Sequence, residues 1–315
     1  MVLAKTGNVV IVGEFFIDEI LSEFHALPKL GEESFARKFR REVGGGAAIT
    51  ACGLARLGVP VAVIGVVGRQ DGSWATRRLT ACGVDASAIE LHPVEPTGLT
   101  VSVSTREDRA FFSYYGANER LPQILRKPAA KAMMSKARLV HFACAPDSQL
   151  DAGLILALRR QRCHISLDVQ SHMSWLTKPD NLGILRQCDM FFPNEREAEW
   201  TSGETGTHQI LHALREKGLR GVGLKMGGKG AALLWRRREF LSDPYSVDTV
   251  DTTGAGDSFN AGFIYAWLRG DPPQRCLEIA NMCGALSTRD LGGVSAFPGV
   301  QELEEFEARH VRQRL

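Results

Sequence analysis

The sequence predicts an α/β protein of the three-layer, Rossmann-like kind, in which helices cover both faces of a mostly parallel sheet. Two patterns predict this fold. Short apolar segments typical of buried strands recur along the chain, and segments with apolar residues spaced by three and four lie between them. A chain of 315 residues, 44% of them hydrophobic, is also long enough to bury a large core. Folds of this class bind their ligands beyond the carboxyl ends of the strands.

The predicted elements alternate along the chain. Strands are expected at residues 8–13, 61–66, 139–143, 165–167, 190–192 and 221–224, because each of these runs is short and apolar. Crossover helices are expected at residues 47–57, 150–160, 195–201 and 208–217, where the apolar spacing is helical.

Two segments interrupt this alternation and predict a small β lid. One is residues 34–43, and the other, residues 98–115, has two strand-like stretches around a turn and predicts a hairpin. Exposed aromatic residues are costly in water, so the hairpin should cover a cleft or meet a partner subunit, as in a homodimer formed through the lid. A hairpin packed on the core is the alternative. We therefore expect a single domain over residues 1–315, with lid segments at about 14–43 and 98–116.

Composition excludes several classes of partner. The 38 Lys+Arg and 36 Asp+Glu residues give a net charge of +2, too small to attract nucleic acid. The longest apolar run, residues 59–68, is too short to cross a membrane. No signal pattern precedes it, and the seven scattered cysteines are interpreted as buried thiols, so a cytoplasmic location is expected. The basic run at residues 236–238 is interpreted as a solubilising turn.

The most informative segment is residues 248–262, Asp-Thr-Val-Asp-Thr-Thr-Gly-Ala-Gly-Asp-Ser-Phe-Asn-Ala-Gly. Gly254 to Gly256 fit a tight turn that opens a helix, where unpaired amides and the positive end of the helix dipole bind anions. Asp257, in the first helical turn, is a carboxylate that can accept a proton from an attacking hydroxyl. The segment therefore indicates phosphoryl transfer, with an acidic residue capping an ordinary helix as the alternative.

Residues 250–262 of this segment resemble the signature of the ribokinase-like (PfkB) carbohydrate kinases, and similar matches extend from Gly13 to Pro298. The resemblance implies the ribokinase-like fold and an ATP- and magnesium-dependent kinase that transfers the γ-phosphoryl group of ATP to a hydroxyl of a sugar. It also implies that Asp257 is the general base. The backbone of Gly254, Ala255 and Gly256 would hold the transferred group.

The same resemblance implies binding roles elsewhere in the chain. The positions that match the sugar site are Asp18, Gly44 and Gly45. The positions that match the nucleotide site are Asn194, Lys225, Gly227, Gly230 and Asn281, with Asn281 at adenine. Glu197, one helical turn after Asn194, matches the residue that holds magnesium through water. Asp251 and the carbonyl of Thr253 match the monovalent-cation (K⁺) site of many members, although two oxygens alone leave an ordinary turn equally open.

Three positions depart from the family pattern. Ile49 replaces an asparagine that contacts a sugar hydroxyl, and Gln170 and His172 replace the asparagine and arginine of a segment found in some sugar-acid kinases. These departures leave the sugar and the phosphorylated hydroxyl undetermined. Two alternatives therefore stay open: a nucleoside kinase, with Phe112 or Tyr114 stacked on the base, and a sugar-sensing protein without turnover.

Overall fold

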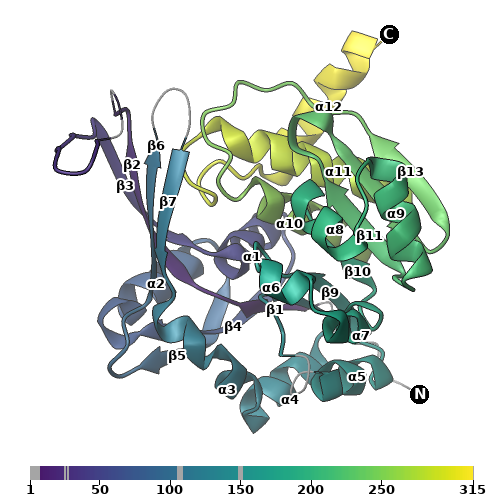
Figure 1. The fold of residues 1–315 in the computed structure, drawn as a ribbon, viewed down its shortest axis with the longest axis horizontal. Helices are drawn as coiled ribbons and strands as arrows, with labels where there is room; N and C mark the ends of the chain where they lie inside the picture. The colour runs from purple at the N-terminus through teal and green to yellow at the C-terminus, as the bar shows by residue number, and fades with distance from the viewer. Residues whose placement is uncertain (1–7, 25, 27, 105–108, 148–151, 315) are drawn as a thin grey trace.

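The computed structural model describes residues 8–24, 26, 28–104, 109–147 and 152–314, which form two sheets and their covering helices (Figure 1). The larger sheet has nine strands and the smaller has four. In the nine-stranded sheet, seven neighbouring strands are parallel, and β12 and β13 complete one edge as antiparallel strands. In spatial order its strands are β13 (Arg238–Ser242), β12 (Ala231–Trp235), β11 (Gly221–Lys225), β10 (Met190–Phe191), β9 (His164–Asp168), β8 (Leu139–Ala143), β1 (Val9–Gly13), β4 (Val61–Gly68) and β5 (Asp85–His92).

Alternation along the strands divides the hydrophobic core between the two faces of this sheet. In β1, Val9 and Ile11 belong to one buried cluster, whereas Val10 and Val12 belong to the other. The helices of the first cluster are α1 (Gly46–Arg56), α2 (Arg69–Ala81), α10 (Ala255–Arg269), α11 (Pro273–Leu286) and α12 (Val300–Arg314). Those of the second are α3 (Leu121–Leu125), α4 (Pro128–Lys136), α5 (Ala152–Arg160), α6 (Met173–Leu176), α7 (Leu182–Leu185), α8 (Glu195–Ser202) and α9 (Thr207–Glu216).

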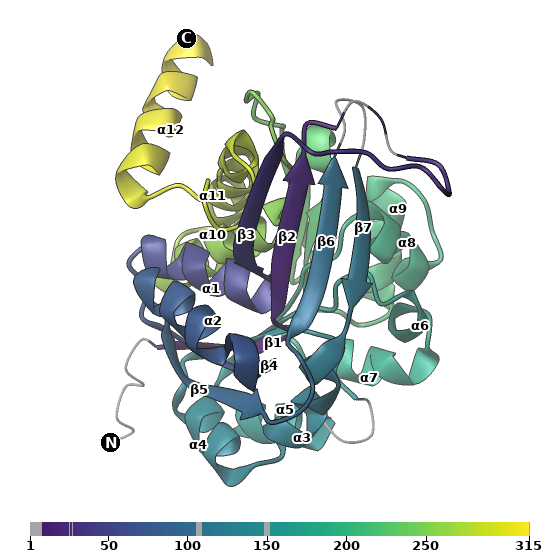
Figure 2. The ribbon, with the colours of Figure 1, turned by 90° about the vertical axis from the view of Figure 1, so that its left-hand side faces the viewer.

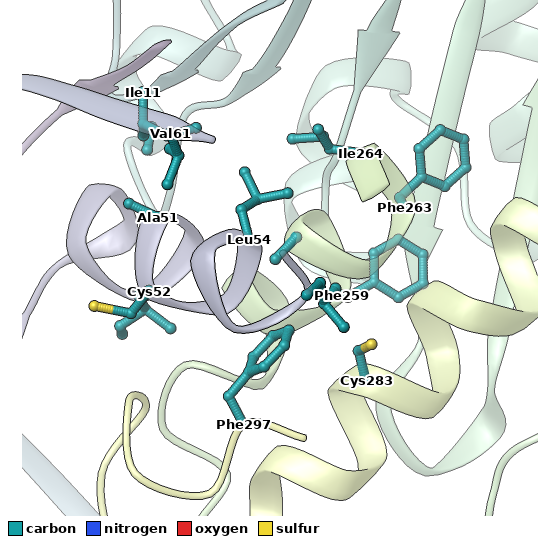
Figure 3. Close-up of a cluster of buried hydrophobic side chains, with 14 of the residues drawn as sticks. Ile11, Ala51, Cys52, Leu54, Val61, Phe259, Phe263, Ile264, Cys283 and Phe297 are labelled. Atoms are coloured by element: carbon teal, nitrogen blue, oxygen red, sulfur yellow. The ribbon is translucent and has the colours of Figure 1, made fainter. Parts of the chain in front are cut away.

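Close packing of α1 on α10 fixes the position of both helix starts. Figure 3 shows the cluster in which they meet, with Leu54 from α1 and Phe259 and Ile264 from α10 all buried. A Cβ added at Gly53 of α1 would lie 2.9 Å from the Cβ of Ala261 in α10, so the two helices leave no room for a side chain there.

The four-stranded sheet stands apart from the body and forms the lid (Figure 2). Its order is β3 (Lys38–Gly44), β2 (Phe16–Ser22), β6 (Gly98–Ser104) and β7 (Arg109–Tyr114). The chain enters it directly from β1, and the connection is held by Asn118, whose side chain accepts from the Phe15 amide and donates to the Phe15 carbonyl, both at 2.9 Å. These bonds satisfy the buried amide and carbonyl of Phe15, which lies between β1 and β2 and belongs to neither sheet.

The predicted α/β architecture with a β lid is confirmed. Each expected strand and helix is present, within a few residues of its predicted bounds, in the part of the chain that the structure describes. The start of the helix expected at 150–160 and the hairpin turn at 106–109 fall largely outside the described residues. Several further elements were not predicted, among them the edge strands β5 and β13 and the helices α2, α4, α11 and α12. All seven cysteines are free, and no helix among the described residues is both long enough and apolar enough to span a bilayer.

Candidate active site

The parallel strands deliver polar side chains to one edge of the central sheet. Glu14 follows β1, Asp168 is the last residue of β9, and Lys225 is the last residue of β11. The first turns of α1 and α10 meet the same edge, because a Cβ at Gly46 would lie only 2.9 Å from Oδ1 of Asp257. Residues from five separate parts of the chain therefore converge beyond the carboxyl ends of the strands, as expected for this class of fold.

The first turn of α10 presents backbone amides that the helix does not use. Its N-cap, Gly254, has φ 73°, a left-handed conformation that favours glycine. The first helical bond runs from Ser258 N to Gly254 O at 2.9 Å, so the amides of residues 255–257 make no such bond. Ala255 N donates to Thr252 O at 3.3 Å, whereas no backbone carbonyl among the described residues accepts from Gly256 N. The Gly256 amide is therefore available to an anion.

Asp257 lies at this turn with its carboxylate buried, 9% exposed. Burial raises the pKa of Asp257 to about 6, helped by the charge of Asp168 and opposed by Lys225 and by a hydrogen bond from Gln170. That bond joins Gln170 Nε2 to Asp257 Oδ1 at 3.1 Å. A carboxyl group with this pKa is ionised at neutral pH and is still basic enough to accept a proton.

Asp168, 2% exposed, joins the elements around Asp257. Its Oδ2 accepts from Lys225 Nζ and from Asn260 Nδ2, both at 2.7 Å, and its Oδ1 accepts from the Gln170 amide at 3.0 Å. Burial opposes ionisation of the pair, but the Lys225 charge holds the pKa of Asp168 below its usual value. The ammonium of Lys225 also lies beside the α10 turn, since a Cβ at Gly256 would be 3.3 Å from Nζ.

The predicted sugar-binding residues lie together on the lid side of this edge. Asp18 is on β2, and its carboxyl group fills the space in front of Gly44, where a Cβ would lie 2.1 Å from Oδ2. Burial raises the pKa of Asp18 to about 7, with further contributions from Asp251, Asp257 and Glu42. Gly45 is the N-cap of α1 with φ 86°. Because a Cβ at the next residue, Gly46, would lie 2.4 Å from Gln170 Nε2, this turn reaches the Asp257 network.

A second buried carboxylate near the lid was not predicted. Glu14 is 6% exposed, accepts a short hydrogen bond from the Tyr115 hydroxyl, and has His172 Nε2 at 3.5 Å from its Oε1. The hydrogen bond that His172 donates to Glu14 raises the pKa of His172. The only sequence signal for Glu14 is a polar residue directly after an apolar strand, and nothing local links it to Tyr115, 101 residues later.

Four of the five predicted nucleotide-binding residues surround a cavity of about 220 Å³. Lys225, Gly227, Gly230 and Asn281 all line it, and Gly256 of the α10 turn forms part of its wall. The Asn281 amide nitrogen already donates to Ser242 Oγ at 3.1 Å and to Asp243 O at 2.7 Å, which leaves its oxygen free for a ligand within the described contacts. The cavity therefore leads directly to the turn that carries Asp257.

Asn194 and Glu197 stand apart from this cavity and form a capping box. Asn194 N and Nδ2 donate to the two Glu197 oxygens at 2.9 and 2.8 Å, and Glu197 N donates back to Asn194 Oδ1 at 2.9 Å. Burial raises the pKa of Glu197 to about 7, against the opposing charge of Lys225. Across the described part of the chain no three His, Cys, Asp or Glu side chains form a metal cluster.

Asp251 fixes the loop before α10. Its Oδ1 accepts from Thr253 N at 2.9 Å and Thr253 Oγ1 at 2.8 Å, and its Oδ2 accepts from Gly292 N at 2.9 Å. These bonds account for Asp251 without an ion, so the monovalent-cation site stays a prediction. Ile49 has a related supporting role: its Cδ1 would lie 2.9 Å from a Cβ at Gly254, so the side chain packs against the α10 turn.

The strand register separates the two faces of the lid. Asp18 is paired with Thr100, and Thr100 with Ser113, so these side chains share the face turned toward Asp257. Phe112 is paired with Val101 and therefore lies on the opposite face, as does Tyr114. Neither aromatic side chain is placed to stack on a nucleoside base in this cleft, because a strand alternates its side chains between faces.

Comparison with known proteins identifies the family of this chain. The model of the pfkB family carbohydrate kinases matches residues 6–298. Deoxyribokinase from Salmonella typhi is 25% identical over 307 residues, covering 95% of this chain and 98% of that protein. Arabidopsis thaliana ribokinase, solved with ribose and ATP, superposes with a TM-score of 0.84 at 25% identity, covering 96% of this chain and 98% of that chain. A structure from E. coli described as ribokinase II, in complex with ATP and Mg²⁺, has a TM-score of 0.83 at 25% identity and covers 97% and 100%. The chain therefore belongs to the PfkB family of carbohydrate kinases.

Proposed function

We propose that this carbohydrate kinase transfers the γ-phosphoryl group of MgATP to a hydroxyl of a neutral sugar, with Asp257 as the general base. One observation carries the proposal: a buried carboxylate lies within a helix turn whose Gly256 amide is available to an anion, beside the ammonium of Lys225. Proton acceptor and phosphoryl-binding groups are thus adjacent, as in-line transfer to a hydroxyl requires.

The steps follow from this placement. The nucleotide occupies the 220 Å³ cavity, with its terminal phosphate at the α10 turn. The attacking hydroxyl hydrogen-bonds to Asp257, which takes its proton as the oxygen bonds to the γ-phosphorus and the bond to the β-phosphate oxygen breaks. The amides of Gly254, Ala255 and Gly256 and the Lys225 ammonium stabilise the charge on the moving group.

The charges around the sugar end favour a neutral substrate. Glu14, Asp18 and Asp257 supply buried carboxyl groups on the lid side. The cations described there are already paired: Lys225 with Asp168 at 2.7 Å, and Arg40 with Asp290 at 3.2 Å. His172 lies 3.5 Å from Glu14. A substrate carboxylate would meet these acidic groups without a free cation, so hydroxyl groups donating to Asp18 fit better than a sugar acid.

A coupled ADP-release screen over neutral sugars, sugar acids and nucleosides tests this function. We expect turnover with a neutral sugar, and we expect Asp257→Asn to lower kcat by about 100-fold or more while ATP binding is retained, because the base is lost. Asp248→Asn, at an exposed carboxylate of the same motif, is the matched control and should behave as wild type. Turnover confined to nucleosides or to sugar acids would contradict the substrate class. Absence of turnover with every compound would instead support a sugar-sensing protein.

The pH dependence tests how Asp257 is tuned. At saturating sugar and MgATP, kcat should fall as the pH drops through about 6, because Asp257 must be ionised to accept a proton. Gln170→Gly keeps the left-handed backbone of residue 170, at φ 56°, and removes the hydrogen bond that stabilises the ionised carboxylate. The acidic limb should therefore move to higher pH in this variant. Ser171→Gly, an exposed neighbour, is the control, and an unmoved limb in Gln170→Gly would reject the role given to Gln170.

The magnesium ion of MgATP is proposed to contact Glu197 through its water ligands. Glu197→Gln removes the charge but retains an oxygen for the capping box, since glutamine also serves at this position. We expect the magnesium concentration for half-maximal activity to rise by about tenfold or more, as for other outer-shell substitutions. Glu199→Gln in the same helix is the control. An unchanged magnesium requirement with an intact helix would restrict Glu197 to capping.

We also propose that the lid joins two copies of the chain. Its face away from Asp18 carries Leu21, Val101 and Val103, together with Phe39 and Phe112, which are 64% and 66% exposed. Glu19 and Arg41 share this face and pair with each other at 3.2 Å. Exposed apolar side chains grouped in this way are typical of an interface.

Analytical ultracentrifugation tests the lid interface. Wild type should sediment as a dimer, and the double variant Phe39→Ser, Phe112→Ser as a monomer, because two large apolar contacts are lost from each copy. Leu156→Ser, at an exposed leucine on α5, should leave the dimer intact. A monomeric wild type at micromolar concentration, or a dimeric double variant, would contradict the proposal.

A further inference from the structure

A second, larger cavity lies at the amino ends of the parallel strands, on the side of the central sheet away from the candidate active site. It has a volume of about 560 Å³, within the range of ligand-binding pockets. It is built where β9 and β11 begin and where β12 and α10 end, with His164, Arg220, Trp235 and Trp267 contributed by these ends. The carboxyl ends of β9 and β11 and the start of α10 form the active site, so the two sites lie at opposite ends of shared elements.

Aromatic rings form one wall of this cavity. The rings of Trp235 and Trp267 have centroids 5.8 Å apart at 89°, and His164 lies 4.9 Å from Trp267. Trp235 and Trp267 are each partly exposed, so their rings are accessible from the cavity. Such a wall offers flat π surfaces to a planar group.

Beside the aromatic wall, most of the cavity lining consists of charged residues. Arg215, Arg220, Arg236 and Arg237 face two acidic residues, Asp189 and Glu216. The two acids already have partners: Glu216 lies 3.3 Å from Arg215, and Asp189 contacts Arg159 at 3.2 Å, His164 at 3.6 Å and the Ile165 amide at 3.0 Å.

Three of these arginines lack a carboxylate partner. In the portion of the chain that the structure describes, Arg220, Arg236 and Arg237 make no ion pair. Arg236 has a left-handed backbone, φ 59°, and its amide donates to Arg220 O at 2.7 Å, which holds the two arginines side by side. The basic run at 236–238 is therefore more than a solubilising turn, because Arg236 and Arg237 both line this cavity.

We propose that this cavity binds a planar aromatic ring that carries a phosphate, such as a nucleoside monophosphate. The ring would lie against the Trp235 and Trp267 wall, and the phosphate would accept hydrogen bonds from Arg220 and Arg236, whose planar guanidinium groups match phosphate geometry. This site is separate from the nucleotide cavity at the catalytic edge and does not depend on the kinase mechanism proposed above.

Isothermal titration calorimetry of the full chain with AMP tests the site. Magnesium and a non-hydrolysable ATP analogue occupy the catalytic cavity, so that remaining AMP binding reports a second site. A titration of the analogue alone counts its own sites, because an analogue that also fills the second cavity would bind at two sites per chain in wild type and at one in the double variant described next. We expect one AMP per chain, and we expect Arg220→Gln, Arg236→Gln together to weaken binding by about tenfold or more, through loss of charge-assisted bonds. Arg238→Gln is the matched control, because Arg238 stacks over Phe240 at 5.4 Å and does not line the cavity.

Ligand fragments test the two halves of the recognition. Adenosine and ribose 5-phosphate should each bind about tenfold or more weakly than AMP, since each lacks either the phosphate or the ring. AMP should also change tryptophan emission, because Trp235 and Trp267 line the cavity. The proposal would be overturned by absence of AMP binding when the ATP analogue itself binds at one site per chain, by equal binding in the double variant, or by equal affinity for ribose 5-phosphate. Kinase turnover in the double variant should match wild type, so failure of this site and failure of the proposed function are distinguishable.

Discussion

The active site depends on one buried charge, the carboxylate of Asp168. Burying an unpaired carboxylate costs several kcal/mol, so the ammonium of Lys225 and the amide of Asn260 must stay in place to compensate it. This requirement ties the ends of β9 and β11 to α10. The same charge raises the pKa of Asp257, and the segment that follows β9 supplies Gln170 to hold it. Asp168 therefore contributes both to the position of Asp257, the proposed base, and to its pKa, which burial raises most.

The lid completes the site from a separate sheet. Asp18 reaches the catalytic edge only because β2 leaves β1 almost at once and because Gly44 has no side chain to block it. Arg40 of β3 donates to Leu291 O at 2.6 Å, and the following residue, Gly292, donates to Asp251. The lid is thus connected through loop 290–292 to the turn before α10. Such a connection suits a reaction in which water must be excluded as a competing phosphoryl acceptor.

The two ends of the parallel strands carry different kinds of side chain. Carboxyl groups gather at the lid side of the catalytic edge, whereas arginines and tryptophans line the cavity at the other edge. Both edges use the same elements, since α10 carries Asp257 near its start and Trp267 near its end. The seven parallel strands all begin on one side of the sheet and all end on the other. The residues before the strands and the residues after them therefore form two chemically distinct surfaces.

The sequence by itself determined the features that depend on neighbouring residues. The alternation of strands and helices, the glycine turn before Asp257, and the spacing of Asn194 and Glu197 follow from local backbone geometry and periodicity, so they were predictable. Only the tertiary structure decided that Gln170 bonds to Asp257 across 87 positions, that Tyr115 bonds to Glu14, and that Arg220 lies beside Arg236. It also decided which lid face carries Phe112. These contacts arise from strand order and register, which bring together residues whose local sequence contains no sign of each other.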